Sequence, residues 1–80
     1  MSSERIVLLG HLQDHQGQVR DVRLRMQGLR DSIRLHLDRH FPLENIEADL
    51  AATQAVELAA LQIVLKEHLE AIKAIKKDLG

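Results

Sequence analysis

The stretch His40-Phe41-Pro42-Leu43-Glu44 decides how this chain folds. It holds the single proline and the single aromatic residue, and it lies at the midpoint of the 80 residues. Proline is unfavourable inside a helix but is well tolerated in its first turn. Helical periodicity runs on both sides of this stretch, so we predict that it is the elbow between two antiparallel helices.

Length and composition limit what the chain can do. Eighty residues form one small domain (1–80) that buries little surface by itself. The absence of cysteine excludes disulfides and thiolate metal ligands, so association with a second chain is the remaining source of stability. The apolar run Ile6–Leu9 is too short for a membrane span or a signal peptide. We therefore expect a cytoplasmic protein without membrane contact.

Charge is divided between the two halves. All the arginines precede the elbow and all the lysines follow it. Residues 1–41 carry a net charge of +2 and residues 42–80 a net charge of −3. The halves are mildly complementary, as the partners in a hairpin can be. The overall charge of −1 gives no general attraction for nucleic acid.

The first half predicts a helix over about residues 3–40. Ser2 and Ser3 are both suitable N-caps. The inward positions alternate steps of four and three, which is a heptad pattern: Leu8, Leu12, His15, Val19, Val22, Met26, Leu29 and Ile33. Gly10 and Gly17 weaken the helix, so a break that separates residues 3–16 is an open alternative.

The second half predicts a helix over about residues 43–79, after a turn at 41–43. Phe41 is expected to pack on Ile46 as a hydrophobic staple, and Gly80 is a suitable C-terminal residue. The apolar stripe comprises Leu43, Ile46, Leu50, Gln54, Leu58, Leu61, Leu65, His68 or Leu69, Ile72, Ile75 and Leu79. The two consecutive steps of four at Leu50–Gln54–Leu58 predict a stutter in the heptad pattern.

The predicted fold is all-α: an antiparallel two-helix hairpin that resembles a coiled coil. A turn between Phe41 and Pro42 pairs residues whose numbers add to about 83. It brings three ion pairs close, which are Arg39–Glu44, Arg34–Asp49 and Arg25–Glu57. Both apolar stripes are wider than a single seam, so we expect two hairpins to form a homodimeric four-helix bundle.

Two histidine pairs have the spacing of metal ligands on a helix. His11 and His15, and likewise His36 and His40, are four residues apart and would share a helix face. A complete zinc site needs three or four ligands, and leucine follows both His11 and His36 where a zinc-protease motif has glutamate. We interpret these histidines as polar surface residues and predict no metal or other cofactor.

His15 and His68 form a different kind of pair. Both occupy seam positions, and their numbers add to 83, so the hairpin would bring them face to face. One interpretation is a polar layer that fixes the register of the helices. The alternative is a pH switch, in which protonation of both rings loosens the layer.

The arginine-rich half raises the possibility of nucleic-acid binding. Arg20, Arg23, Arg30 and Arg34 recur at helical spacing and can share a face. Asp21 and Asp31 lie on the same flank, and no aromatic residue is interleaved for base stacking. A solvated, ion-paired helix face is the competing interpretation.

Parts of the chain resemble small helical proteins of Mu-like prophages. The likeness rests on residues 55–62 (AVELAALQ), residues 72–80 (IKAIKKDLG) and the Phe41-Pro42-Leu43-Glu44 turn, about half of the chain. The resemblance implies a phage or prophage origin. It implies no particular activity.

The residues present do not predict an enzyme. There is no cysteine nucleophile, no glycine-rich phosphate loop and little concave surface in a two-helix protein. We expect a small non-enzymatic helical interaction or assembly module that acts through an unknown protein partner. The alternative is a nucleic-acid-associated regulatory protein that uses the arginine-rich first helix.

Overall fold

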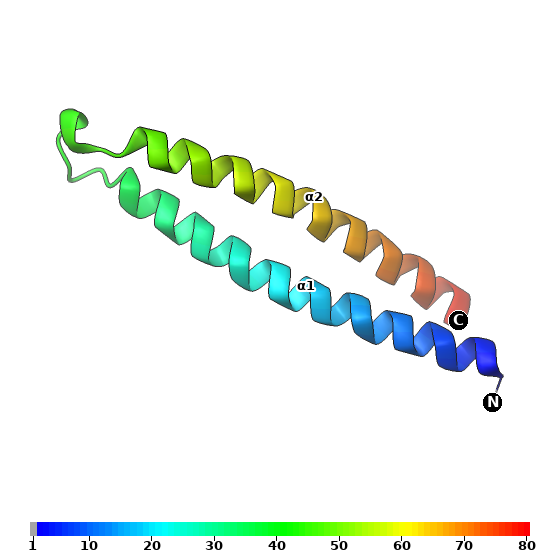
Figure 1. Ribbon diagram of the computed structural model, residues 1–80. Coiled ribbons are helices and arrows are strands. Elements are labelled where there is room, and N and C mark those ends of the chain that lie inside the picture. Colours follow the sequence, from blue (N-terminus) through cyan, green and yellow to red (C-terminus); the bar gives the residue numbers. More distant parts are fainter. Residues whose placement is uncertain (1) are drawn as a thin grey trace.

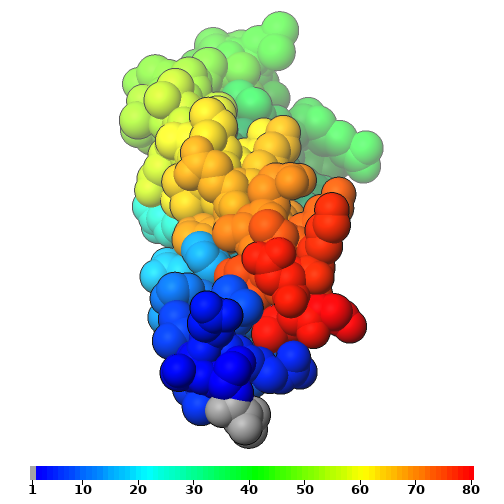
Figure 2. Space-filling view, turned by 90° about the vertical axis from the view of Figure 1, so that its right-hand side faces the viewer, coloured from blue at the N-terminus to red at the C-terminus, as the bar shows by residue number. Residues whose placement is uncertain are grey.

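Two long antiparallel helices and a short loop make up the molecule (Figure 1). In the computed structural model, which describes residues 2–80, helix α1 is Ser3–His36 and helix α2 is Ala48–Leu79, with a 3₁₀ helix η1 (Leu43–Asn45) in the loop. The hairpin measures 63 × 16 × 14 Å. Figure 2 looks at its open end, where the first turns of α1 lie beside the last turns of α2. The prediction of an all-α hairpin is confirmed.

The first helix begins where its capping residue predicts. The hydroxyl oxygen of Ser2 accepts a hydrogen bond from the backbone N–H of Arg5 over 3.2 Å, which satisfies one of the free donors of the first turn. The helix then continues through Gly10 and Gly17 without interruption. The alternative of a separate helix at residues 3–16 is therefore wrong.

The elbow is longer than predicted. Helix α1 ends at His36 rather than His40, and α2 begins at Ala48 rather than Leu43. A proline disfavours helical geometry in the residue before it. Pro42 lies in the loop directly before η1 and is not part of α2. The expected staple at the start of α2 is also wrong, because Phe41 is 47% exposed and lies seven residues before that helix begins.

Several hydrogen bonds to backbone groups hold the loop, and two of them shape its ends. The Asp38 carboxylate accepts a hydrogen bond from the backbone N–H of His40 over 2.8 Å, which is a typical turn made by an aspartate side chain. The backbone N–H of Glu47 donates to the carbonyl oxygen of His36 over 3.0 Å. The second bond joins the last residue of α1 to the residue before α2, so it fixes the distance between the helices at the elbow.

The interior is a single seam between the helices. On α1 it follows the predicted heptad positions, with Val19 and Leu29 buried and the others half-buried. On α2 the seam passes through Ala51, which is 5% exposed, and leaves Leu50 45% exposed. From Ala51 the seam alternates steps of three and four to Leu79, with His68 rather than Leu69 on the inside. The predicted stutter is therefore wrong, and the heptad pattern is continuous.

The register agrees with the predicted pairing. His15 contacts His68 and His36 contacts Glu47, and both pairs add to 83. The Arg25–Glu57 ion pair forms at 2.8 Å. The other two predicted ion pairs, Arg34–Asp49 and Arg39–Glu44, are not among the ion pairs formed within residues 2–80. They would lie at the elbow, where the longer loop changes the spacing.

Candidate functional site

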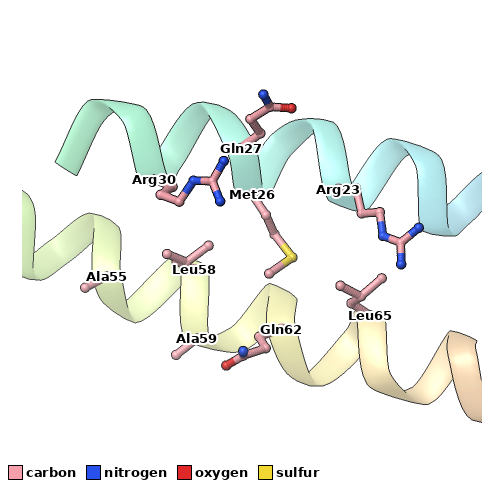
Figure 3. Close-up of a pocket in the computed structure, with 9 residues that line it drawn as sticks. All are labelled: Arg23, Met26, Gln27, Arg30, Ala55, Leu58, Ala59, Gln62 and Leu65. Carbon is pink, nitrogen blue, oxygen red and sulfur yellow. The ribbon is translucent and has the colours of Figure 1, made fainter. Parts of the chain in front are cut away.

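A shallow groove runs along one long side of the hairpin. Its first section, near the middle of the molecule, has a volume of about 580 Å³ and is shown in Figure 3. Met26 reaches down from α1, and Leu58 and Leu65 point up from α2, so the floor is apolar. Ala55 and Ala59 add only methyl groups on the α2 side, which leaves room for another chain. The lining residues are Arg23, Met26, Gln27, Arg30, Ala55, Leu58, Ala59, Gln62 and Leu65.

A second section continues the groove toward the open end. Its volume is about 520 Å³, and it shares Arg23 and Gln27 with the first section. The lining residues are Gln16, Val19, Arg20, Arg23, Leu24, Gln27, Leu69, Ile72 and Lys76. The two sections therefore form one continuous groove with an apolar floor and cationic walls.

The walls of this groove carry positive charge only. Residues seven apart lie on the same side of each helix of a coiled coil. Gln27 and Ala59 both line the groove. Arg20 and Arg34 lie seven residues before and after Gln27, and Lys66 and Lys73 follow Ala59 at steps of seven, so these cations lie on the side of the groove. We call this side the basic face, and its exposed cations are Arg20, Arg23, Arg30, Arg34, Lys66, Lys73 and Lys76. The heptad positions that hold these cations contain no aspartate or glutamate anywhere in α1 or α2.

Most of these cations are free of ion pairs. Within residues 2–80, Arg20 alone among them lies near a carboxylate, that of Asp21 at 4.0 Å, and both side chains are about three-quarters exposed. By contrast, Arg25 lies about 200° round α1 from Arg23 and is bound by Glu57 through two hydrogen bonds. The structure thus places the four predicted arginines on one side of α1, and only Arg20 among them lies near a carboxylate of residues 2–80. Lys66, Lys73 and Lys76 were not predicted to lie on this face, although their heptad positions on α2 indicate it.

His15 and His68 face each other in the seam, as predicted. Their Nδ1 atoms are 2.8 Å apart, and their ring centroids are 5.1 Å apart with the planes tilted by 56°. Both side chains are half-buried. A bond of this kind requires one ring to donate from Nδ1 and the other to accept at Nδ1.

The four histidines with metal-ligand spacing are placed as follows. His15 is turned toward His68 while His11 is exposed, and His36 and His40 do not share a helix face because α1 ends at His36. Instead, His36 Nδ1 lies 2.9 Å from the Glu47 carboxylate. Within residues 2–80 no three histidine, aspartate or glutamate side chains come close enough to hold a metal ion.

The outward side of α2 is apolar and lies away from the groove. Leu50, Glu57 and Val64 follow one another at steps of seven, so they share the side on which Glu57 meets Arg25. Val56 and Ile63 lie next to them and are 72% and 61% exposed. We call the set Leu50, Val56, Ile63 and Val64 the apolar strip.

Helix α2 is also long and apolar enough to cross a membrane. An 18-residue window within Ala48–Leu79 has a mean hydropathy of 1.3, and only 6% of it is buried in the hairpin. The high hydropathy arises because apolar residues and alanines occur on several sides of α2. A search for unbroken apolar runs, of which Ile6–Leu9 is an example, does not detect it. By itself the window shows how much apolar surface the single hairpin leaves uncovered.

Comparison of the chain with family models, curated proteins and solved structures yields no match. The resemblance to helical proteins of Mu-like prophages therefore stays a prediction.

Proposed function

We propose that this protein is a non-enzymatic assembly module in which two hairpins associate through the apolar strip of α2. The observation that carries the proposal is the exposure of Leu50, Val56, Ile63 and Val64 along one side of a single helix. Among residues 2–80, only Val19, Leu29 and Ala51 are buried within the hairpin. Removal of apolar surface from water is the main driving force of association, so a second copy stabilises what the single hairpin leaves exposed.

The surface area supports a dimer of the obligate kind. The hairpin exposes 6283 Å², whereas a compact monomer of 9.1 kDa exposes about 4,900 Å². Each chain thus exposes roughly 1,400 Å² more than a compact monomer. Covering that excess on both copies gives an interface within the roughly 2,000–5,000 Å² of obligate homodimers.

Electrostatic repulsion disfavours the basic face as the interface between the two copies. A twofold contact through the basic face would bring seven cations of one hairpin against seven of the other. The apolar strip carries no cation and lies near the middle of α2, with Ile63 and Val64 at the midpoint of Ala48–Leu79. A twofold axis there pairs each of these residues with its copy and builds a four-helix bundle.

Light scattering of the purified chain tests this proposal directly. We expect a solution mass of twice 9.1 kDa at micromolar concentration, and helix content that falls together with the dimer on dilution. A well-folded monomer throughout that range would refute the proposal.

A second candidate function is nucleic-acid association through the basic face. The observation in its favour is the set of seven exposed cations without carboxylates at the neighbouring heptad positions. Phosphate contacts made by such a set weaken steeply with salt. Fluorescence anisotropy with duplex DNA between about 50 and 200 mM salt measures this, and the absence of binding at the lower concentration removes the candidate.

A further inference from the structure

The basic face combines two properties that together define a partner. Arginines of α1 and a lysine of α2 stand on its walls, and its floor is apolar with alanine on one side. We infer that it is the docking groove for an acidic amphipathic helix of another protein, which lies along the hairpin as a third helix. The inference deepens the proposed function, because it specifies the partner that the hairpin binds while its apolar strip is covered by a second copy.

The floor is the first argument for a helix. Met26, Leu58 and Leu65 line one section, and Val19, Leu69 and Ile72 line the other. Apolar side chains of an incoming helix gain by covering such a floor, as in other helix-in-groove complexes. A phosphate backbone gains nothing from it, and the single aromatic residue of the chain, Phe41, lies in the elbow and not on this face. The floor therefore favours a helix over a nucleic acid.

The small residues are the second argument. Packed helices approach to roughly 8–10 Å between their axes, and the distance depends on the side chains at the contact. Ala55 and Ala59 stand on the wall of α2 beside the floor, where a larger residue would close the groove. Ala52 precedes Ala59 by seven residues and extends the same wall toward the elbow.

The placement of charge is the third argument. In the half near the elbow the cations come from α1, from Arg20 to Arg34, opposite the alanine wall of α2. In the half near the open end they come from α2, from Lys66 to Lys76. The cations span about 27 residues of helix, roughly 40 Å. A partner helix of that length with acidic residues on both flanks would meet the arginines on one flank and the lysines on the other, and the heptad positions that hold these cations contain no carboxylate.

A labelled synthetic helix tests the inference on the full-length chain. The probe is a peptide of about 28 residues with leucine and isoleucine at heptad positions and glutamate on both flanks. The control peptide has the same composition with its apolar residues scrambled. We expect the first peptide to bind, and the scrambled one to bind at least about tenfold more weakly. Equal affinity for both peptides would overturn the inference, because charge alone would then explain the binding.

Three variants locate the binding on the groove. The double variant Arg23→Gln/Arg30→Gln and the variant Ala59→Leu are each expected to weaken binding of the first peptide about tenfold. Arg25→Gln is the matched control, since Arg25 lies on the opposite side, and it should leave the affinity unchanged. Circular dichroism verifies that each variant retains its helices. Full binding by both groove variants would contradict the inference.

The same set of proteins separates the other occupants. Duplex DNA that binds more tightly than the peptide, and equally well to Ala59→Leu, would overturn the inference and assign the face to nucleic acid. Peptide binding by a chain that light scattering shows to be monomeric would sustain the inference while the dimer proposal fails. A dimer that does not bind the peptide would overturn the inference and leave the dimer proposal standing.

Discussion

His15 and His68 share a hydrogen bond across the seam, with their Nδ1 atoms 2.8 Å apart. One Nδ1 must carry a hydrogen and the other must not, so the two Nδ1 atoms share a single hydrogen. A layer of this kind disfavours other alignments of the helices, because any shift in register would leave two half-buried imidazoles without partners.

The histidine layer predicts that the loss of one ring is costly. The single variant His15→Leu leaves the half-buried ring of His68 without its partner, so its free energy of unfolding should fall by about 1–3 kcal/mol. Denaturant unfolding measures this.

The double variant His15→Leu/His68→Leu is the matched comparison. It should be more stable than the single variant, since an apolar layer replaces a polar one and no imidazole is left without a partner. A double variant as unstable as the single one would rule out the bond between the rings as the source of the loss. A role for the pair as a pH switch stays a prediction.

The apolar strip predicts which surface substitution disrupts the dimer. Ile63→Lys places a charge at the centre of the proposed interface and should shift the solution mass toward the monomer. Leu24→Lys is the matched control, because Leu24 is 65% exposed and Ile63 is 61% exposed, but Leu24 lies at the edge of the groove on the other side. Sedimentation equilibrium should show a dimer for this control; dissociation of both variants to the same extent would argue against the strip.

Gln54 is a further polar residue in the seam, in addition to His15 and His68, and it predicts a stabilising substitution. Its Oε1 atom is buried and has no hydrogen-bond partner within residues 2–80. A buried polar atom without a partner costs roughly 1–3 kcal/mol. Gln54→Leu should therefore raise the free energy of unfolding by about 1 kcal/mol or more, measured by chemical denaturation. A loss of stability would mean that Oε1 is solvated or paired in solution.

Gly10 predicts a stabilising substitution outside the seam. The helix is regular at this residue, and a Cβ atom added there would meet nothing within 4 Å. Gly10→Ala should raise stability by about 1 kcal/mol, because alanine loses less conformational entropy on helix formation. Thermal unfolding measures this, and Gly28→Ala provides a replicate at a second open position. If neither substitution stabilises the protein, α1 is frayed at these residues in solution.

Much of the fold follows from the spacing of residues in the sequence. The alternation of steps three and four defines the seam of α1, and the position of Pro42 sets the pairing that brings His15 to His68. Helix boundaries at the elbow do not follow in the same way. Pro42 indicates that a helix cannot continue, but it does not indicate that η1 forms before α2 or that the N–H of Glu47 donates to the carbonyl oxygen of His36 at the end of α1.

The seam at Leu50 and Ala51 shows where sequence patterns mislead. Leucine is the more apolar residue, so hydrophobicity alone places Leu50 inside. The structure buries Ala51, because the heptad spacing of the rest of α2 continues through it. Periodicity that is maintained over a whole helix outweighs the hydrophobicity of one side chain.

The hairpin, its register and the pairing of His15 with His68 can all be predicted from the sequence, because they depend on spacing along the chain. The length of the elbow and the formation of a basic face from both helices follow only from the packed structure. Arg23 and Lys76 are far apart in the sequence, and only the antiparallel packing of α1 on α2 places them along one groove. Local propensity specifies each helix, but a surface shared by two helices depends on how each is rotated about its own axis.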